Sequence, residues 1–104
     1  MDANGQPYEF DAVLDTGFNG SLTLPTATIA TLGLPWINRG SAILANGMVE
    51  DCDIYRGVVL WDSQPHNILV EAADTDPLLG MRLMSGYRII IEDVDGGSVA
   101  IESI

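Results

Sequence analysis

Residues 12–25 read Ala-Val-Leu-Asp-Thr-Gly-Phe-Asn-Gly-Ser-Leu-Thr-Leu-Pro, so an apolar strand runs directly into Asp15, Thr16 and Gly17. The end of a strand is a rigid place for a carboxylate, and the glycine lets backbone or a bound chain come close. A carboxylate buried alone costs free energy, so we expect Asp15 to have a partner or a shifted pKa. Because this motif occurs once, a second carboxylate of the same kind would have to come from another copy of the chain.

The length and composition fit one small domain over residues 1–104. Hydrophobic residues make up 47% of the chain, which is enough for a core. A domain of this size buries a limited share of its surface, so packing against a second copy would stabilise it. The 11 glycines and 5 prolines, with stretches rich in Val, Ile and Leu, favour short strands joined by turns.

The charge is strongly acidic, with 15 acidic residues against four arginines, no lysine and a net charge of −11. Nucleic acids and anionic membranes bind basic surfaces, so we expect neither as a partner. Without lysine the chain has no Walker-type phosphate loop and no lysine nucleophile or Schiff base. The acidic surface either favours basic or neutral ligands or serves solubility alone.

The single cysteine, Cys52, excludes an internal disulfide and a cysteine-based zinc site. We expect no metal and no cofactor, and a reducing compartment, the cytoplasm, as the location. No apolar run is long enough to span a membrane, and the start of the chain lacks the pattern of a signal peptide.

The apolar patterning predicts many short strands and two short helices. Turn dipeptides such as Asn46-Gly47 predict hairpin tips, and Gly33 and Gly86 predict helix ends. The hairpin partner of the first strand is expected before Met1. The predicted strands are 8–14, 22–24, 36–45, 48–61, 66–73, 87–92 and 99–104, and the predicted helices are 26–32 and 81–85. This arrangement predicts an all-β fold, either a small closed β-barrel or a closed sandwich.

Three segments together resemble a known family. Leu14-Asp15-Thr16-Gly17 resembles the active-site loop of retropepsin-type aspartic proteases. The hairpin with Ala45-Asn46-Gly47 at its tip is similar to the flap of that family, and Leu78-Leu79-Gly80 resembles the apolar-apolar-glycine motif before its C-terminal helix. The tripeptide alone is a weak signal, but the three motifs in this order, over Tyr8 to Ile104, are specific.

Two positions depart from the viral members of the family. Phe18 stands where the viral enzymes carry a small residue, and Met81 stands where they carry an arginine. Both resemble the bacterial single-domain relatives, whose pattern is similar to Asp-Thr-Gly-Phe and Leu-Leu-Gly-Met. The resemblance therefore implies a retropepsin-type barrel of the bacterial kind.

The resemblance also implies a function, that of a homodimeric aspartic endopeptidase acting on peptide or protein substrates. Two Asp15 carboxylates, one from each copy, would share a proton and activate a water, with Thr16 and Gly17 supporting the loop. The substrate-binding residues implied by the resemblance are Asn19, Ala45, Asn46, Gly47 and Leu79. The alternative is a dimer of the same fold that binds or assembles peptides without cleaving them.

Simpler interpretations also stand beside these assignments. Asp15-Thr16-Gly17 is also a common strand-to-turn sequence, and Leu78-Leu79 fits core packing. His66 follows a proline at a turn, and we expect it to be exposed. A Cys52–His66 pair is a further option on paper. The remaining acidic clusters fit polar turns or a solvated strand face without the spacing of a calcium loop: Glu50, Asp51, Asp53, Asp74, Asp76, Asp93 and Asp95.

Overall fold

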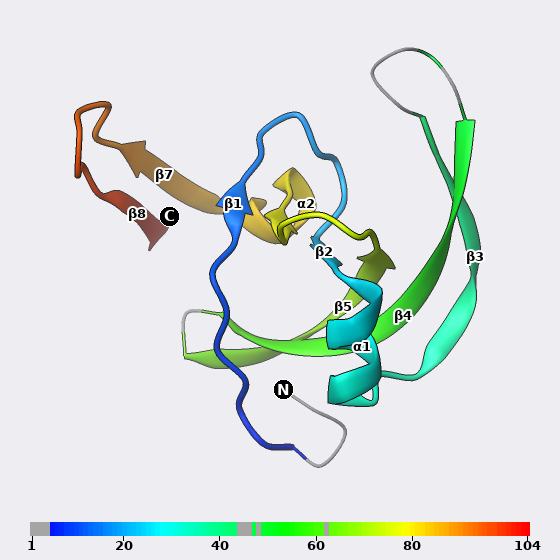
Figure 1. The fold of residues 1–104 in the computed structure, drawn as a ribbon. Helices are drawn as coiled ribbons and strands as arrows, with labels where there is room; N and C mark the ends of the chain where they lie inside the picture. The colour runs from blue at the N-terminus through cyan, green and yellow to red at the C-terminus, as the bar shows by residue number, and fades with distance from the viewer. Residues whose placement is uncertain (1–4, 44–46, 48, 62) are drawn as a thin grey trace.

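The computed structural model describes residues 5–43, 47, 49–61 and 63–104 (Figure 1). The protein is mostly β: 47% of its residues lie in strands, which form two sheets, and 12% lie in helices. The strands are β1 (Val13–Leu14), β2 (Leu22–Leu24), β3 (Trp36–Ile43), β4 (Val49–Trp61), β5 (Gln64–Ala72), β6 (Leu78–Leu79), β7 (Tyr87–Ile91) and β8 (Val99–Ser103). The helices are α1 (Thr26–Leu32) and α2 (Met81–Met84), so both predicted helices are confirmed.

The larger sheet combines long hairpins with short parallel pairs. Its six strands follow the order β1-β6-β2-β5-β4-β3, and β7 and β8 form a separate two-stranded sheet. β3, β4 and β5 pair antiparallel through consecutive hairpins, whereas β1 pairs with β6 and β2 pairs with β5 in parallel. In Figure 1 the β7–β8 sheet lies on the opposite side of the molecule from β3. The parallel pairs join segments that are far apart in the sequence.

The predicted closed barrel is not found in the described part of the chain, where the strand order runs from β1 to β3 without returning. The first strand, predicted over 8–14, is a strand only at Val13–Leu14. Residues 6–12 have no regular structure and belong to neither of the two described sheets. Alternating apolar residues such as Tyr8 and Phe10 stay exposed there, because a strand needs a neighbour for its backbone groups as well as a suitable pattern.

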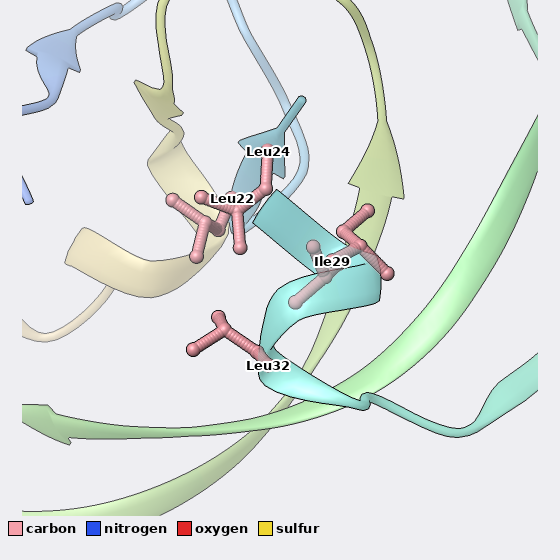
Figure 2. Close-up of a cluster of buried hydrophobic side chains, with 5 residues drawn as sticks. Leu22, Leu24, Ile29 and Leu32 are labelled. Atoms are coloured by element: carbon pink, nitrogen blue, oxygen red, sulfur yellow. The ribbon is translucent and has the colours of Figure 1, made fainter. Parts of the chain in front are cut away.

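The main core lies between β2, β5 and α1 (Figure 2). β2 is central in the sheet and is covered by α1, so all three of its residues are buried. Burying a leucine or isoleucine side chain fully stabilises a fold by about 1.5–3 kcal/mol. The buried side chains of this core are Leu22, Leu24, Ile29, Leu32 and Val70.

Helix α1 is capped at its start by a residue from a distant loop. Its N-cap is Pro25, which makes no side-chain cap hydrogen bond. The N–H of Thr26 donates instead to Oδ1 of Asp74 at 3.0 Å, and this hydrogen bond lowers the pKa of the Asp74 carboxyl. At the other end Gly33 adopts a left-handed conformation (φ 66°) and donates its N–H to the carbonyls of Ile29 and Ala30. The Asp74 contact ties the loop before β6 to the core helix.

We predict that Asp74→Ala destabilises the protein in a pH-dependent manner. A carboxyl whose pKa is lower in the folded state stabilises the fold above its unfolded pKa, near 3.8, and this stabilisation is lost as the pH falls through the folded pKa. Urea unfolding at pH 7 should therefore show lower stability for the variant, and the difference should shrink toward about pH 2. Asp76→Ala removes a neighbouring charge that does not cap α1, so equal pH profiles for both variants would contradict the assignment.

Candidate active site

Asp15 lies at the end of β1, where this strand pairs in parallel with β6. Val13 is opposite Leu78 and Leu14 is opposite Leu79. The N–H of Asp15 donates to the carbonyl of Leu79 at 2.9 Å. Since parallel strands end on the same side of a sheet, Asp15 and Gly80 follow their strands at neighbouring positions. The fold thus brings together two of the three motifs singled out in the sequence.

The Asp15 carboxylate is half-buried and is held by its own loop. The N–H of Gly17 donates to Oδ1 of Asp15 at 2.9 Å, and the N–H of Phe18 donates to the carbonyl of Asp15 at 3.2 Å. An N–H bond to an ionised carboxylate is stronger than one between neutral groups. Among the described residues Oδ2 accepts no hydrogen bond, so one oxygen is fixed by the loop and the other has no protein partner there. The sequence predicted that Asp15 needs a partner or a shifted pKa, and within one chain its partner is the backbone N–H of Gly17.

The loop after Asp15 is fixed by the start of α2. Three consecutive N–H groups, those of residues 80–82, donate to three carbonyls of residues 18–21 at 2.8–3.2 Å. The pairs are Gly80 to Ser21, Met81 to Phe18 and Arg82 to Gly20. Gly80 is buried, and a Cβ atom at this position would lie 2.0 Å from the carbonyl oxygen of Gly20. Only glycine lets the two segments approach this closely.

We predict that Gly80→Ala destabilises the fold by about 3 kcal/mol, because the added methyl group forces two backbone segments apart. Chemical denaturation measures this loss, and the loop resonances of residues 15–21 should shift in an NMR spectrum. The control is Ala30→Ser on the exposed face of α1, which should leave stability nearly unchanged. A Gly80→Ala protein with unchanged stability would show that the contact between the two segments is loose.

The predicted site residues divide into two groups. Asp15, Thr16, Gly17 and Asn19 share one loop, and Thr16, Gly17 and Asn19 are exposed there. Leu79 pairs with Leu14 beside this loop, and its half-buried side chain also packs on the core. Leu79 and the Asp15 loop therefore lie at the same end of the sheet, where β1 pairs with β6.

The predicted flap residues lie on the β3–β4 hairpin, which is confirmed as a hairpin by its pairing from Trp36 to Ile43. Gly47 is exposed and has a positive φ of 83°, which fits a tight turn. Ala45 and Asn46 lie outside the described residues. In Figure 1 this hairpin and the loop between β1 and β2 extend toward the same end of the molecule. In hydrogen-bonded order, however, β3 and β1 are opposite edges of the sheet.

Sequence reasoning missed the residues that hold the loop. Gly20 and Ser21 contribute carbonyls to the contact with residues 80–82, and Arg82 contributes an N–H to it, yet none of these three residues was predicted to belong to the site. The pair of glycines at 17 and 20 was the one available signal. A backbone contact leaves little trace in residue type, so the sequence indicated Gly80 but not its partners.

A second carboxylate lies close to the Asp15 loop. Glu71 is on β5 and is half-buried. Its side chain lies close to Gly20, because a Cβ atom added to this glycine would be 3.5 Å from Oε2 of Glu71. Burial raises the pKa of the Glu71 carboxyl because it disfavours the charged form. The ionised side chain therefore costs the fold some stability.

We predict that Glu71→Gln stabilises the protein at neutral pH. A carboxyl whose pKa is raised by folding favours the fold below its unfolded pKa, near 4.5, and this contribution is lost as the pH rises through the folded pKa. The variant should therefore unfold at a higher temperature than the parent at pH 7, and the gain should vanish below about pH 4. Glu9→Gln, at an exposed glutamate, is the control. A gain that is constant with pH would contradict this explanation.

Other candidate chemistry finds no support in the geometry. Cys52 lies on β4 opposite Gly40, and His66 lies on β5 opposite Val59 of β4. The positions of Cys52 and Val59 are roughly 20 Å apart along β4, which excludes a Cys52–His66 catalytic pair. His66 is exposed as expected, although it lies in β5 rather than in a turn. Over the described ranges no three His, Cys, Asp or Glu side chains gather as a metal site. Neither of the helices described is long and apolar enough to cross a membrane.

Comparison of the chain with protein-family models, with curated proteins and with solved structures finds no match. The functional assignment therefore depends on the residues and geometry of the chain itself.

Proposed function

We propose that the protein is an aspartic endopeptidase of the retropepsin type, active as a homodimer that carries one Asp15 from each copy. The observation that supports this most strongly is the contact between the Asp15 loop and residues 80–82, which fixes a half-buried carboxylate at a strand end. A fixed carboxylate needs little reorganisation when a substrate binds. The finer fold proposed is the bacterial single-domain form, and the cytoplasm is the proposed location because the lone Cys52 needs no oxidising compartment.

The proposed reaction uses two carboxylates that share one proton. Two such groups a few ångströms apart do not both ionise readily, so one stays charged and the other protonated. The charged carboxylate takes a proton from a bound water, and the water oxygen attacks the peptide carbonyl carbon. The protonated carboxylate gives its proton to the carbonyl oxygen. The tetrahedral species then breaks its C–N bond: the amine nitrogen takes the proton held by the first carboxylate, and the second carboxylate takes a proton from a hydroxyl of the tetrahedral carbon. No covalent enzyme intermediate forms.

We assign roles to the groups around Asp15 from the hydrogen bonds and the exposure of this loop. The N–H of Gly17 is occupied by Oδ1 of Asp15, so its carbonyl is the group that remains for the backbone of an extended peptide. Asn19 and Leu79 border the same surface, and the hairpin of Gly47 would close over the peptide and exclude water. The exposed hydroxyl of Thr16 would bind the backbone of the other copy and fix the two loops together.

A second copy is also favoured by the C-terminal sheet. β7 and β8 form only two strands, and a two-stranded sheet is marginally stable by itself in water. Apolar side chains remain exposed on or beside it: Ile90, Ile91, Val94, Val99 and Ile104. Packing of this sheet against another copy would bury them, and a twofold axis would give each chain the same contact.

We predict that Asp15→Asn abolishes cleavage of unstructured peptides, with a loss of at least about 10²–10⁴-fold, because the amide neither accepts nor donates the catalytic proton. The parent should show a bell-shaped pH profile weighted to acid pH, since the shared-proton state exists only between two apparent pKa values. Asp11→Asn, an exposed carboxylate just before β1, is the matched control and should retain activity.

A mixing experiment separates the dimeric mechanism from the alternatives. Asp15→Asn protein mixed with the parent should reduce activity roughly as the square of the parent fraction, because a mixed dimer has one carboxylate. A linear decrease would show that one chain suffices. If the parent dimer binds extended peptides but never cleaves them, the protein is the peptide-binding module named as the alternative.

A further inference from the structure

The few cationic side chains of this acidic chain are unevenly distributed. The chain holds four arginines and one histidine against 15 acidic residues. Arg56, Arg82 and His66 line a single cavity of about 450 Å³, a volume typical of ligand sites. Of the other two arginines, Arg39 lies on β3 and Arg88 on β7. Two of the four arginines therefore line this one cavity together.

The two guanidinium groups of this cavity have no acidic partner in the part of the chain that the structure describes. The ion pair found there joins Arg88 to Glu102, at 3.8 Å, outside the cavity. A guanidinium presents donors in a planar fork that fits a carboxylate in a bidentate manner. Asn67 and His66 add further side chains able to donate hydrogen bonds at the same place. These side chains are exposed, and such a set of donors fits an anionic acceptor.

Trp61 supplies a second and independent observation. Its indole Nε1–H is buried, and no described group accepts a hydrogen bond from it. The ring lines the cavity and is held edge-on against Tyr87, with ring centroids 5.8 Å apart. A buried donor without an acceptor costs free energy. Because the ring of this residue lines the cavity, its indole N–H signal reports on what the cavity holds.

The edge of β5 favours a peptide as the ligand that bears the anionic group. β4 pairs with β5 from Gln64 to Glu71, but β2 covers the other edge only from Val70 to Ala72. Residues 64–69 therefore have one edge without a strand neighbour among the described segments. Residues 66–69 of this edge line the cavity, and Leu83 supplies an apolar wall. An extended peptide adds to such an edge through main-chain hydrogen bonds.

We propose that this cavity binds an acidic peptide segment, which extends along the free edge of β5 and places an Asp or Glu carboxylate between Arg56 and Arg82. The Trp61 ring borders the same cavity, and Tyr87 supports the ring. Ser21 and Arg82 line this cavity and also contribute backbone groups to the contact that holds the Asp15 loop, but Asp15 is not among the lining residues, so the proposal does not depend on the proposed catalysis.

The two tryptophans give a direct test by NMR. The indole N–H signal of Trp61 reports on the cavity, and that of Trp36, exposed and bonded to Asp53, is an internal reference. Trp36→Phe assigns the two signals. Titration with the peptide acetyl-Val-Glu-Val-amide should shift the Trp61 signal and leave that of Trp36 in place. The matched peptide acetyl-Val-Gln-Val-amide should bind about tenfold more weakly, because it lacks the charge.

Variants locate the carboxylate. Arg56→Gln and Arg82→Gln should each weaken binding of the Glu peptide about tenfold, whereas Arg39→Gln should change it less than about twofold. The backbone N–H of Arg82 that holds the Asp15 loop is unaffected by this change. Asp15→Asn should bind the peptide like the parent, so a failed protease assignment leaves this test intact. Free glutarate should bind more weakly than the peptide, because it makes no main-chain contact with β5.

Several outcomes would overturn the assignment. One is a Trp61 signal that does not respond to millimolar Glu peptide, and another is an equal response to the Glu and Gln peptides. Tighter binding of inorganic phosphate or of glutarate than of the peptide would also contradict a peptide site. A Trp61 shift that follows protein concentration without any peptide would assign the cavity to a second copy of this chain.

Discussion

The architecture depends on one contact between two distant segments, the loop 15–21 and the turn into α2. Three consecutive N–H groups of residues 80–82 meet three carbonyls of residues 18–21, and the β1–β6 pair continues this contact up to Asp15. Gly80 allows it because any side chain would meet the carbonyl of Gly20. Without this contact the strand that carries Asp15 would have no neighbour, since β6 is its sole pairing partner in the described sheet.

The local elements could largely be predicted from the sequence, because their signals are local. Pro25 and Gly33 mark the two ends of α1, and Gly80 precedes α2. The β4–β5 hairpin was predicted from a long apolar run that a turn interrupts. The expectation for residues 8–14 was wrong over most of its length, because alternation of apolar residues does not supply a pairing partner. Closure of a barrel depends on such long-range pairing, and no local pattern encodes it.

The residues of the candidate site could be predicted where their side chains form the site, but not where only their backbone groups take part. Asp15, Thr16, Gly17 and Leu79 were identified by residue type and order, and they lie together. The cap of α1 by the Asp74 side chain and the backbone contact of Ser21 were not predictable, because each reaches a main-chain group across a long sequence separation. The cavity of Arg56 and Arg82 was missed for a related reason, since its residues come from β4, β5 and α2 without any shared motif.

The most direct test of the proposed catalysis is a crystal structure of the protein with a peptide mimic that carries a hydroxyl group at the position of the cleaved bond. Two chains should be related by a twofold axis that passes between their Asp15 carboxylates, with the hydroxyl bound between the two carboxylates. A dimer in which the two Asp15 side chains lie far apart or face solvent would contradict the proteolytic function.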